Sequence, residues 1–249
     1  MNNEIEYDEV EMPEELPEGI PTLNKMGYMT SSLDNYSRQF ATYSSMCEGQ
    51  VLEIGAAYGI ATLEALSKGA QVLSNDLSAD HLKILEKKCP EEHKERLTTR
   101  VGNFLEIELP ENHFDAILMA RVVHFMDGET IRKAFSRCFD LLKKDGKLFV
   151  VSDTPYMQDS ISFIEAFEQR LRNKEEWPGL VEDITPIGSP SIPNLPKLFH
   201  FLDTITLKRE LEFAGFYVEE VSYFSRDDYP ASVRLDGREG IGAIVTKKE

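Results

Sequence analysis

The sequence is poor in cysteine and contains no long hydrophobic run. Its three cysteines, Cys47, Cys89 and Cys138, are far apart and form no CxxC pair. We therefore expect neither a disulfide framework nor a structural zinc site, and a reducing, cytoplasmic compartment. No apolar stretch approaches the ~18 residues of a membrane span, so no membrane association is expected. The five histidines show no metal-ligand spacing, and no metal is expected.

Basic residues are also scarce. The chain has 27 Lys and Arg against 44 Asp and Glu, for a formal net charge of −17. Such a surface repels phosphate, so nucleic acid is not an expected partner. Residues 1–24 contain eight acids, three prolines and no base. This composition predicts an acidic, flexible leader over 1–24 that is not a secretory signal, followed by a single domain over 25–249.

Short apolar segments alternate with helical patterns from residue 31 to residue 152. The patterns predict strands over 50–54, 71–75, 97–101, 114–119 and 147–152, and helices over 31–46, 60–68, 78–88 and 129–144. A helix over 206–214 and an antiparallel pair of strands over 216–223 and 241–247 complete the chain. Strands that alternate with helices of this length indicate an α/β fold, a doubly wound and mostly parallel sheet.

Residues 153–203 interrupt this alternation. A helical pattern over 160–174 is followed by Trp177-Pro178 and then by four further prolines. A Pro-rich stretch of this length between sheet elements is typical of a functional cover, so we expect a lid insertion here. Trp177 and Phe199 are candidates for lining a substrate pocket beneath it, with ordinary packing as the alternative.

The loop after the first sheet strand is the best candidate for ligand binding. In open α/β sheets the ligand lies beyond the carboxyl ends of the strands. Gly55 and Gly59 allow the backbone to turn close to a ligand, and Ala56 and Ala57 keep the loop small. The GxGxxG spacing of dinucleotide sites is absent. The Glu53 carboxylate would repel a pyrophosphate and suits a cationic ligand.

Residues 51–59 (VLEIGAAYG) resemble the first motif of class I S-adenosylmethionine-dependent methyltransferases, with Ala57 where that family most often has its middle glycine. Residues 114–125 (FDAILMARVVHF) resemble the family's fourth strand, and 141–150 (LLKKDGKLFV) its passage into the fifth. The resemblance covers about residues 50–150 and returns weakly over 206–247. It implies seven strands, with the seventh antiparallel between the fifth and sixth, and S-adenosylmethionine as the cofactor, with S-adenosylhomocysteine as the product.

Several residues would then bind the cofactor. Asp76 at the end of the second strand can accept both ribose hydroxyls, with a role as a helix cap as the alternative. The resemblance implies that Leu77 lies against adenine and that Asn103 and Phe104 stand where the family often has Gly-Asp near the adenine amino group. It also places Ala120 and Arg121 near the methionine end of the cofactor, and Tyr36, from a helix that folds over the cofactor, beside its sulfonium.

Three residues are candidates for catalysis. His124 follows the fourth strand and can act as a general base, or it is simply a packed histidine. Asp153 and Tyr156 follow the fifth strand, where Asp153 can hold a substrate amine or hydroxyl. Thr154-Pro155-Tyr156 is not the Asn/Asp-Pro-Pro-Tyr/Phe motif of the branch that methylates nucleobases and glutamine, so that substrate class is disfavoured.

The sequence thus predicts a methyltransferase with a small-molecule acceptor, and a protein acceptor stays open. Two other functions remain as alternatives. One is a non-catalytic cofactor-binding or effector protein with the same fold, because Asn103 departs from the family pattern and no base is decisive. The other, less favoured, is an NAD(P)-dependent oxidoreductase. The acceptor, the methylated atom and the oligomeric state are not predicted.

Overall fold

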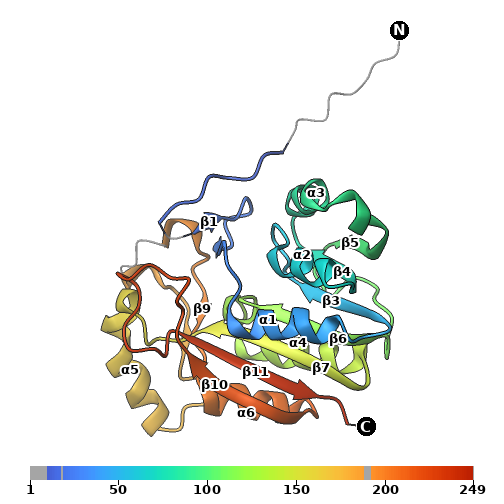
Figure 1. Cartoon of the computed structure of the whole chain (residues 1–249). Coiled ribbons are helices and arrows are strands. Elements are labelled where there is room, and N and C mark those ends of the chain that lie inside the picture. The colour runs from blue at the N-terminus through green and yellow to red at the C-terminus, as the bar shows by residue number, and fades with distance from the viewer. Residues whose placement is uncertain (1–9, 18, 188–191, 249) are drawn as a thin grey trace.

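A seven-stranded sheet forms the centre of the protein. The computed structural model describes residues 10–17, 19–187 and 192–248. The sheet has the order β10-β11-β7-β6-β3-β4-β5 (Figure 1). Its strands are β3 (Gln50–Ile54), β4 (Gln71–Asp76), β5 (Leu97–Val101), β6 (Phe114–Ala120), β7 (Leu142–Asp153), β10 (Tyr217–Phe224) and β11 (Gly240–Thr246). β11 is antiparallel to both neighbours and the other neighbouring strands are parallel, so the predicted α/β topology is confirmed.

Helices cover both faces of this sheet. The main helices are α1 (Asn35–Ser44), α2 (Ile60–Ser67), α3 (Ala79–Lys88), α4 (Gly128–Leu141) and α6 (Thr204–Phe213). In β3, Val51 belongs to the apolar cluster with α1 and α2, whereas Leu52 and Ile54 belong to the cluster with α4 and α6. Alternate side chains of one strand are thus buried on opposite faces, as in a doubly wound sheet.

Polar caps set where several helices begin. Asp34, Ser78, Asp127 and Asp203 each accept a hydrogen bond from a backbone N–H in the first turn of the helix that follows. The cap at Ser78 confirms the predicted start of α3. Because Asp34 and Asp203 are the caps of their helices, α1 begins after the predicted residue 31 and α6 begins two residues before the predicted residue 206.

The passage from α4 into β7 differs from the prediction. The helix ends at Leu141 rather than at Lys144, and β7 begins at once. Leu142 pairs with Phe114 of β6, and the register then shifts before Lys147 pairs with Ala116. Asp145 has φ +62° and donates its N–H to the Lys247 carbonyl at 2.7 Å. Pairing with neighbouring strands therefore extends β7 through a segment whose local sequence indicates a helix end and a turn.

Two small antiparallel pairs lie outside the main sheet and were not predicted. β1 (Ile20–Pro21) pairs with β2 (Tyr28–Met29), and β8 (Leu180–Val181) pairs with β9 (Phe199–His200). Residues 1–9 and 18 of the expected leader lie outside the described residues, but Ile20 and Thr22 are buried against the rest of the chain. These two residues of the expected leader therefore pack on the folded chain.

The segment 154–203 contains α5 (Ile161–Arg172), the β8–β9 pair and short 3₁₀ turns at Gln158–Ser160, Thr185–Ile187 and Ile192–Asn194. Two further 3₁₀ turns, Glu91–Arg96 and Val123–Phe125, precede β5 and α4. Within the segment 154–203, an apolar cluster contains Tyr156, Phe163, Phe167 and Phe201. In the described part of the chain, no helix has the length and apolar character needed to cross a bilayer.

Candidate active site

A large cavity opens at the carboxyl ends of β3, β4 and β6. Its volume is about 1330 Å³, including space open to solvent. Most residues predicted to bind the cofactor line it: Glu53, Gly55, Ala56, Ala57, Asp76, Leu77, Asn103, Phe104, Ala120 and Arg121. Gly59 does not. A side-chain carbon at Gly59 would lie 2.1 Å from Cδ1 of Leu85, so this glycine allows α3 to pack close to the loop.

The loop after β3 is held in a left-handed turn by the neighbouring strand. Gly55 and Ala57 have φ values of +72° and +45°. The N–H groups of Gly55 and Ala56 both donate to the carbonyl of Asn75 at 2.9 Å. A side-chain carbon at Gly55 would lie 2.4 Å from Val122, which explains the need for glycine there. Ala57 adopts the left-handed conformation despite its methyl group.

Glu53 lies beneath this loop and is buried, with an exposed fraction of 5%. Its carboxyl group accepts a hydrogen bond from the hydroxyl of Thr62 in α2. The same hydroxyl lies 2.6 Å from Oγ of Ser74. Burial raises the pKa of Glu53 to about 7, with a smaller contribution from the Asp76 charge and opposition from the Thr62 bond. The carboxyl group is therefore only partly ionised at neutral pH, and a nearby cation would favour its ionised form.

The Asp76 carboxylate is fixed by three donors. Oδ2 accepts the Ala57 N–H at 2.8 Å, and Oδ1 accepts the Ser78 N–H at 2.8 Å. Oδ1 also lies 2.9 Å from Nδ1 of His81. Nε2 of His81 accepts the Leu23 N–H at 3.1 Å, so the ring proton is on Nδ1 and is donated to Asp76. Sequence reasoning missed His81, which has no local signal beyond its place in the first turn of α3.

The far wall of the cavity carries the residues predicted near adenine. Leu77 is apolar and 58% exposed at the rim, whereas Phe104 is buried. The Asn103 side chain is engaged in its own turn: Oδ1 accepts the Leu105 N–H at 3.1 Å and Nδ2 donates to Glu106 at 3.1 Å. Its carbonyl oxygen retains one lone pair for a ligand donor.

A second cavity of about 820 Å³ adjoins the first. Met26, Tyr28, Arg121 and Phe125 line both cavities. Predicted site residues His124, Asp153 and Phe199 line the second one, together with apolar side chains from the segment 154–203: Met157, Ile184, Ile187, Leu195 and Phe201. The two cavities are therefore neighbours that share a wall at the end of β6.

His124 is buried in the wall of the second cavity. Its ring stacks on Phe199 with centroids 4.7 Å apart, and its Nδ1 lies 3.6 Å from Oδ2 of Asp153. This separation is too long for a hydrogen bond, and Nδ1 is without a hydrogen-bond partner among the described residues. Burial lowers the pKa of His124 to about 4, although the Asp153 charge opposes this shift. The imidazole is thus neutral at physiological pH.

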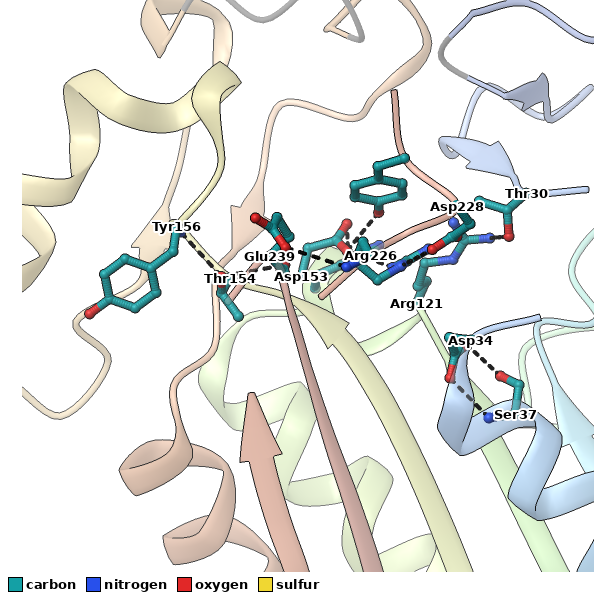
Figure 2. Close-up of polar contacts among 12 residues, drawn as sticks. Thr30, Asp34, Ser37, Arg121, Asp153, Thr154, Tyr156, Arg226, Asp228 and Glu239 are labelled. Carbon is teal, nitrogen blue, oxygen red and sulfur yellow. Dashed lines mark hydrogen bonds and ion pairs between the residues drawn. The ribbon is translucent and has the colours of Figure 1, made fainter. Parts of the chain in front are cut away.

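Asp153 belongs to a buried network that sequence reasoning missed (Figure 2). Oδ1 accepts the Tyr229 hydroxyl at 2.8 Å and Nη1 of Arg226 at 3.3 Å. Arg226 also donates two bonds to Asp228, at 2.9 and 2.6 Å. In the sequence Arg226 and Asp228 belong to a short charged stretch, which would ordinarily be assigned to a solvated loop.

Besides Gly59, three further predicted residues lie outside both cavities. Tyr36 is buried; its hydroxyl donates to Glu220 at 2.6 Å and its ring packs against Phe224, so it faces β10 rather than the cofactor cavity. The guanidinium carbon of Arg238 lies over the Tyr156 ring, 3.5 Å from the ring centroid. Figure 2 shows the Tyr156 side chain directed away from Asp153. The Trp177 ring packs against the guanidinium groups of Arg132 and Arg209.

Comparisons with known proteins agree with this geometry. A family model described as a methyltransferase domain matches residues 52–150. An uncharacterized methyltransferase from Staphylococcus carnosus (strain TM300) is 29% identical over 172 residues, which cover 68% of this chain and 76% of the relative. Another uncharacterized methyltransferase, from Geobacillus sp. (strain WCH70), is 29% identical over 165 residues, which cover 66% of this chain and 74% of the relative.

Solved structures share the fold. A SAM-dependent methyltransferase from Methanosarcina mazei superposes with a TM-score of 0.63 at 16% identity, covering 87% of this chain and 98% of that one. The 1,6-didemethyltoxoflavin-N1-methyltransferase from Burkholderia thailandensis superposes with a TM-score of 0.60 at 16% identity. The match covers 86% of this chain and 79% of that one, which was solved with 1,6-didemethyltoxoflavin and S-adenosylhomocysteine. With the strand order, these findings support a class I S-adenosylmethionine-dependent methyltransferase, to whose fold the chain is similar.

Proposed function

We propose that this protein transfers a methyl group from S-adenosylmethionine to a small molecule held in the second cavity. The observation that carries the proposal is the shared wall: Met26, Tyr28, Arg121 and Phe125 line both cavities. Methyl transfer is an in-line displacement, so donor and acceptor must occupy adjoining spaces with direct access to each other. A cofactor in the first cavity and an acceptor in the second would be adjacent, as this reaction requires.

The residues of the first cavity fit a phosphate-free, cationic nucleoside. S-Adenosylmethionine supplies an electrophilic methyl group on a sulfonium when bound. The fixed Asp76 carboxylate is suited to ribose hydroxyls, and the exposed Leu77 side chain to one face of adenine. The buried Glu53 carboxyl group beneath the loop suits positive charge and disfavours a pyrophosphate. A nicotinamide dinucleotide therefore fits this cavity poorly.

The second cavity supports proton removal from an acceptor. His124 is neutral and lines the second cavity, so its ring can take a proton as the acceptor is methylated. The Asp153 carboxylate, 3.6 Å away, would stabilise the protonated ring. Arg226 and Tyr229 hold this carboxylate in place. We assign His124 the role of general base and Asp153 the role of the carboxylate that stabilises its protonated form, with segment 154–203 as the cover over the acceptor.

Binding tests the cofactor assignment directly. Calorimetry should show saturable binding of S-adenosylhomocysteine, and neither NAD nor NADP should compete with it. Binding of a nicotinamide dinucleotide without binding of S-adenosylhomocysteine would contradict the proposal and favour an oxidoreductase.

Turnover tests the acceptor assignment. The protein should transfer label from methyl-labelled S-adenosylmethionine to at least one member of a synthetic panel of phenols, amines, thiols and nitrogen heterocycles. His124→Gln should lower kcat while S-adenosylhomocysteine affinity is retained. Label that enters only protein would favour a protein acceptor, and binding without any transfer would favour a non-catalytic effector.

A further inference from the structure

We propose that His81 is a positioning residue that ties the ribose-binding carboxylate to a hairpin roofing the cofactor cavity. The N-terminal hairpin is defined here as residues 20–29, which contain β1 and β2. The inference rests on the proposed function, because it assigns the ribose to Asp76. The inference adds His81, which does not line the acceptor cavity but fixes both the Asp76 carboxylate and the N-terminal hairpin.

Both nitrogens of His81 are engaged, and the side chain is buried with an exposed fraction of 1%. Nδ1 lies 2.9 Å from Oδ1 of Asp76, and Nε2 accepts the Leu23 N–H at 3.1 Å. One neutral imidazole therefore connects the end of β4 to a backbone amide of the hairpin. The connection requires a group that donates on one side and accepts on the other, which few side chains offer.

Tyr58 forms a second part of the same contact. Its hydroxyl lies 3.1 Å from the Leu23 N atom and donates to the Pro21 carbonyl at 2.8 Å. Its ring meets the His81 ring edge to face, with centroids 5.0 Å apart. Tyr58 belongs to the loop after β3, so the hairpin is attached to the two elements that carry the loop and the Asp76 carboxylate.

The hairpin in turn shapes both cavities. Thr22, Asn24, Met26, Tyr28 and Met29 line the cofactor cavity, and Met26 and Tyr28 also line the second cavity. On its far side, the Gly27 N–H donates to the Asn194 carbonyl at 2.7 Å. A hairpin detached from His81 would open the roof of the cofactor cavity and move the wall between the two cavities. Cofactor binding and closure of the hairpin should therefore be coupled through His81.

Three variants separate this role from general stability. His81→Phe removes both hydrogen bonds, His81→Gln retains a donor and an acceptor on one amide group, and Tyr58→Phe removes only the hydroxyl bonds to the hairpin. We expect His81→Phe to weaken S-adenosylhomocysteine binding by about tenfold, the effect of losing one or two buried hydrogen bonds. His81→Gln should recover most of the affinity. Asp80→Ala, at an exposed position on the same helix, should leave binding unchanged.

Tyr58→Phe should also weaken binding, although it leaves Asp76 and His81 intact. Because Tyr58 and His81 act on the same amide, their effects should not add. The affinity loss in His81→Phe/Tyr58→Phe should be smaller than the product of the two single losses. Independent, multiplicative effects would contradict a shared contact with the hairpin.

Proteolysis reports the hairpin itself. Lys25 is exposed and is the first basic residue of the chain, so tryptic cleavage after it releases a distinct N-terminal fragment. We expect S-adenosylhomocysteine to slow this cleavage in the wild type and in His81→Gln, but much less in His81→Phe. Ligand-free His81→Phe should also be cleaved faster than ligand-free wild type. Circular dichroism at the same temperature checks that each variant is folded.

The outcomes distinguish this inference from the proposed function. Equal affinity and equal cleavage rates in wild type and His81→Phe would overturn the role of His81 and leave the methyltransferase assignment intact. Failure of the wild type to bind S-adenosylhomocysteine would overturn both. Weaker binding in His81→Phe that His81→Gln does not improve would assign the effect to packing of the ring, which also contradicts the proposal.

Discussion

The Asp76 carboxylate shows how bonds within the protein prepare a ligand-binding atom. Three donors, from Ala57, Ser78 and His81, hold it in one orientation before any ligand arrives. A carboxylate fixed in this way loses little conformational entropy when it accepts ribose hydroxyls. Its orientation is therefore part of the affinity, and it depends on residues that never touch the ligand.

Replacing this carboxylate tests the ribose assignment. Asp76→Ala should weaken S-adenosylhomocysteine binding by about 1–3 kcal/mol, the cost of hydrogen bonds to a charged group that are no longer made. Isothermal titration calorimetry at constant pH measures the change. Unchanged affinity in Asp76→Ala would mean that the ribose lies elsewhere in the cavity.

Ala57 is a strained residue in the same loop. It has φ +45°, a conformation that costs an alanine roughly 1–2 kcal/mol and a glycine almost nothing. Ala57→Gly should therefore raise the free energy of unfolding, by about 0.5–1 kcal/mol after the greater entropy of the unfolded glycine is counted. Urea denaturation measures it, with Ala61→Gly inside α2 as a control that should destabilise the protein. A loss of stability in Ala57→Gly would show that the methyl group makes contacts worth more than the strain.

The local sequence determines the position of some of the predicted site residues. Asp76 and Gly55 lie at strand ends, so the sheet pattern places them in the cavity. For Tyr36, helical spacing predicts only that the side chain faces inward. Which strand it meets depends on β10, nearly 200 residues later in the chain, whose Glu220 accepts its hydroxyl. Burial raises the pKa of Tyr36, as expected for a phenol that is held as a hydrogen-bond donor.

At the scale of elements, the connection from β10 to β11 holds the acceptor side of the site together. The Glu239 carboxylate accepts the N–H groups of Leu235, Asp236 and Gly237 and so closes the end of this connection. At its other end, Arg226 joins Asp228 to Asp153 of β7. The connection has no regular secondary structure, and buried polar bonds replace the strand or helix ladder that would otherwise order it.

The buried guanidinium should be essential for this connection. Arg226→Met retains bulk but leaves Asp153 and Asp228 without their cation, and removing one partner of a buried ion pair costs about 3–5 kcal/mol. Urea denaturation should show a loss of this order. Arg234→Met, which removes a half-exposed guanidinium from the same connection, should cost less than about 1 kcal/mol. Similar losses for the two variants would mean that the Arg226 network does not order the connection.

The elements that were predicted and those that were missed differ in their physical basis. The residues of β3 match the predicted strand because a short apolar run followed by a small-residue loop determines it locally. The hairpin over 20–29 has only two-residue strands, and it is ordered by contacts with Tyr58 and His81 that no local pattern encodes. Contacts between distant segments likewise decide the extension of β7 and the position of Arg226.

At the scale of the whole molecule, three buried groups give stability a pH dependence with opposing contributions. Burial lowers the pKa of His124 and of His200 to about 4, from an ordinary value of 6.5. Between these values the unfolded chain binds protons that the folded chain does not, so stability falls as the pH falls from 6.5 towards 4. Each group contributes a loss of about 3 kcal/mol at the acid end of this range.

Glu53 has the opposite effect. Burial raises its pKa from an ordinary value of 4.5 to about 7. Between these values the folded chain keeps a proton that the unfolded chain has released, so stability falls as the pH rises from 4.5 towards 7. The contribution of Glu53 is again about 3 kcal/mol, and it offsets one of the two histidines across the shared range.

Glu53→Gln separates these contributions. A glutamine keeps the size and an acceptor for the Thr62 hydroxyl but carries no charge that must be buried. In the ligand-free protein, the variant should match the wild type near pH 4.5 and exceed it by about 2–3 kcal/mol at pH 8, because the wild type must ionise a buried carboxyl group there. Urea denaturation across this pH range measures the difference.

Cofactor binding should favour the wild type over Glu53→Gln, opposite to the effect on the stability of the ligand-free protein. A cationic nucleoside in the cavity favours the ionised form of Glu53, so its binding to the wild type at pH 6 should release protons. Calorimetry in buffers of different ionisation enthalpy counts these protons, and Glu53→Gln should release fewer and bind S-adenosylmethionine more weakly. If proton release were identical in the two proteins, Glu53 would not respond to the ligand. Burial of this carboxyl group would then lower the stability of the protein without contributing to cofactor affinity.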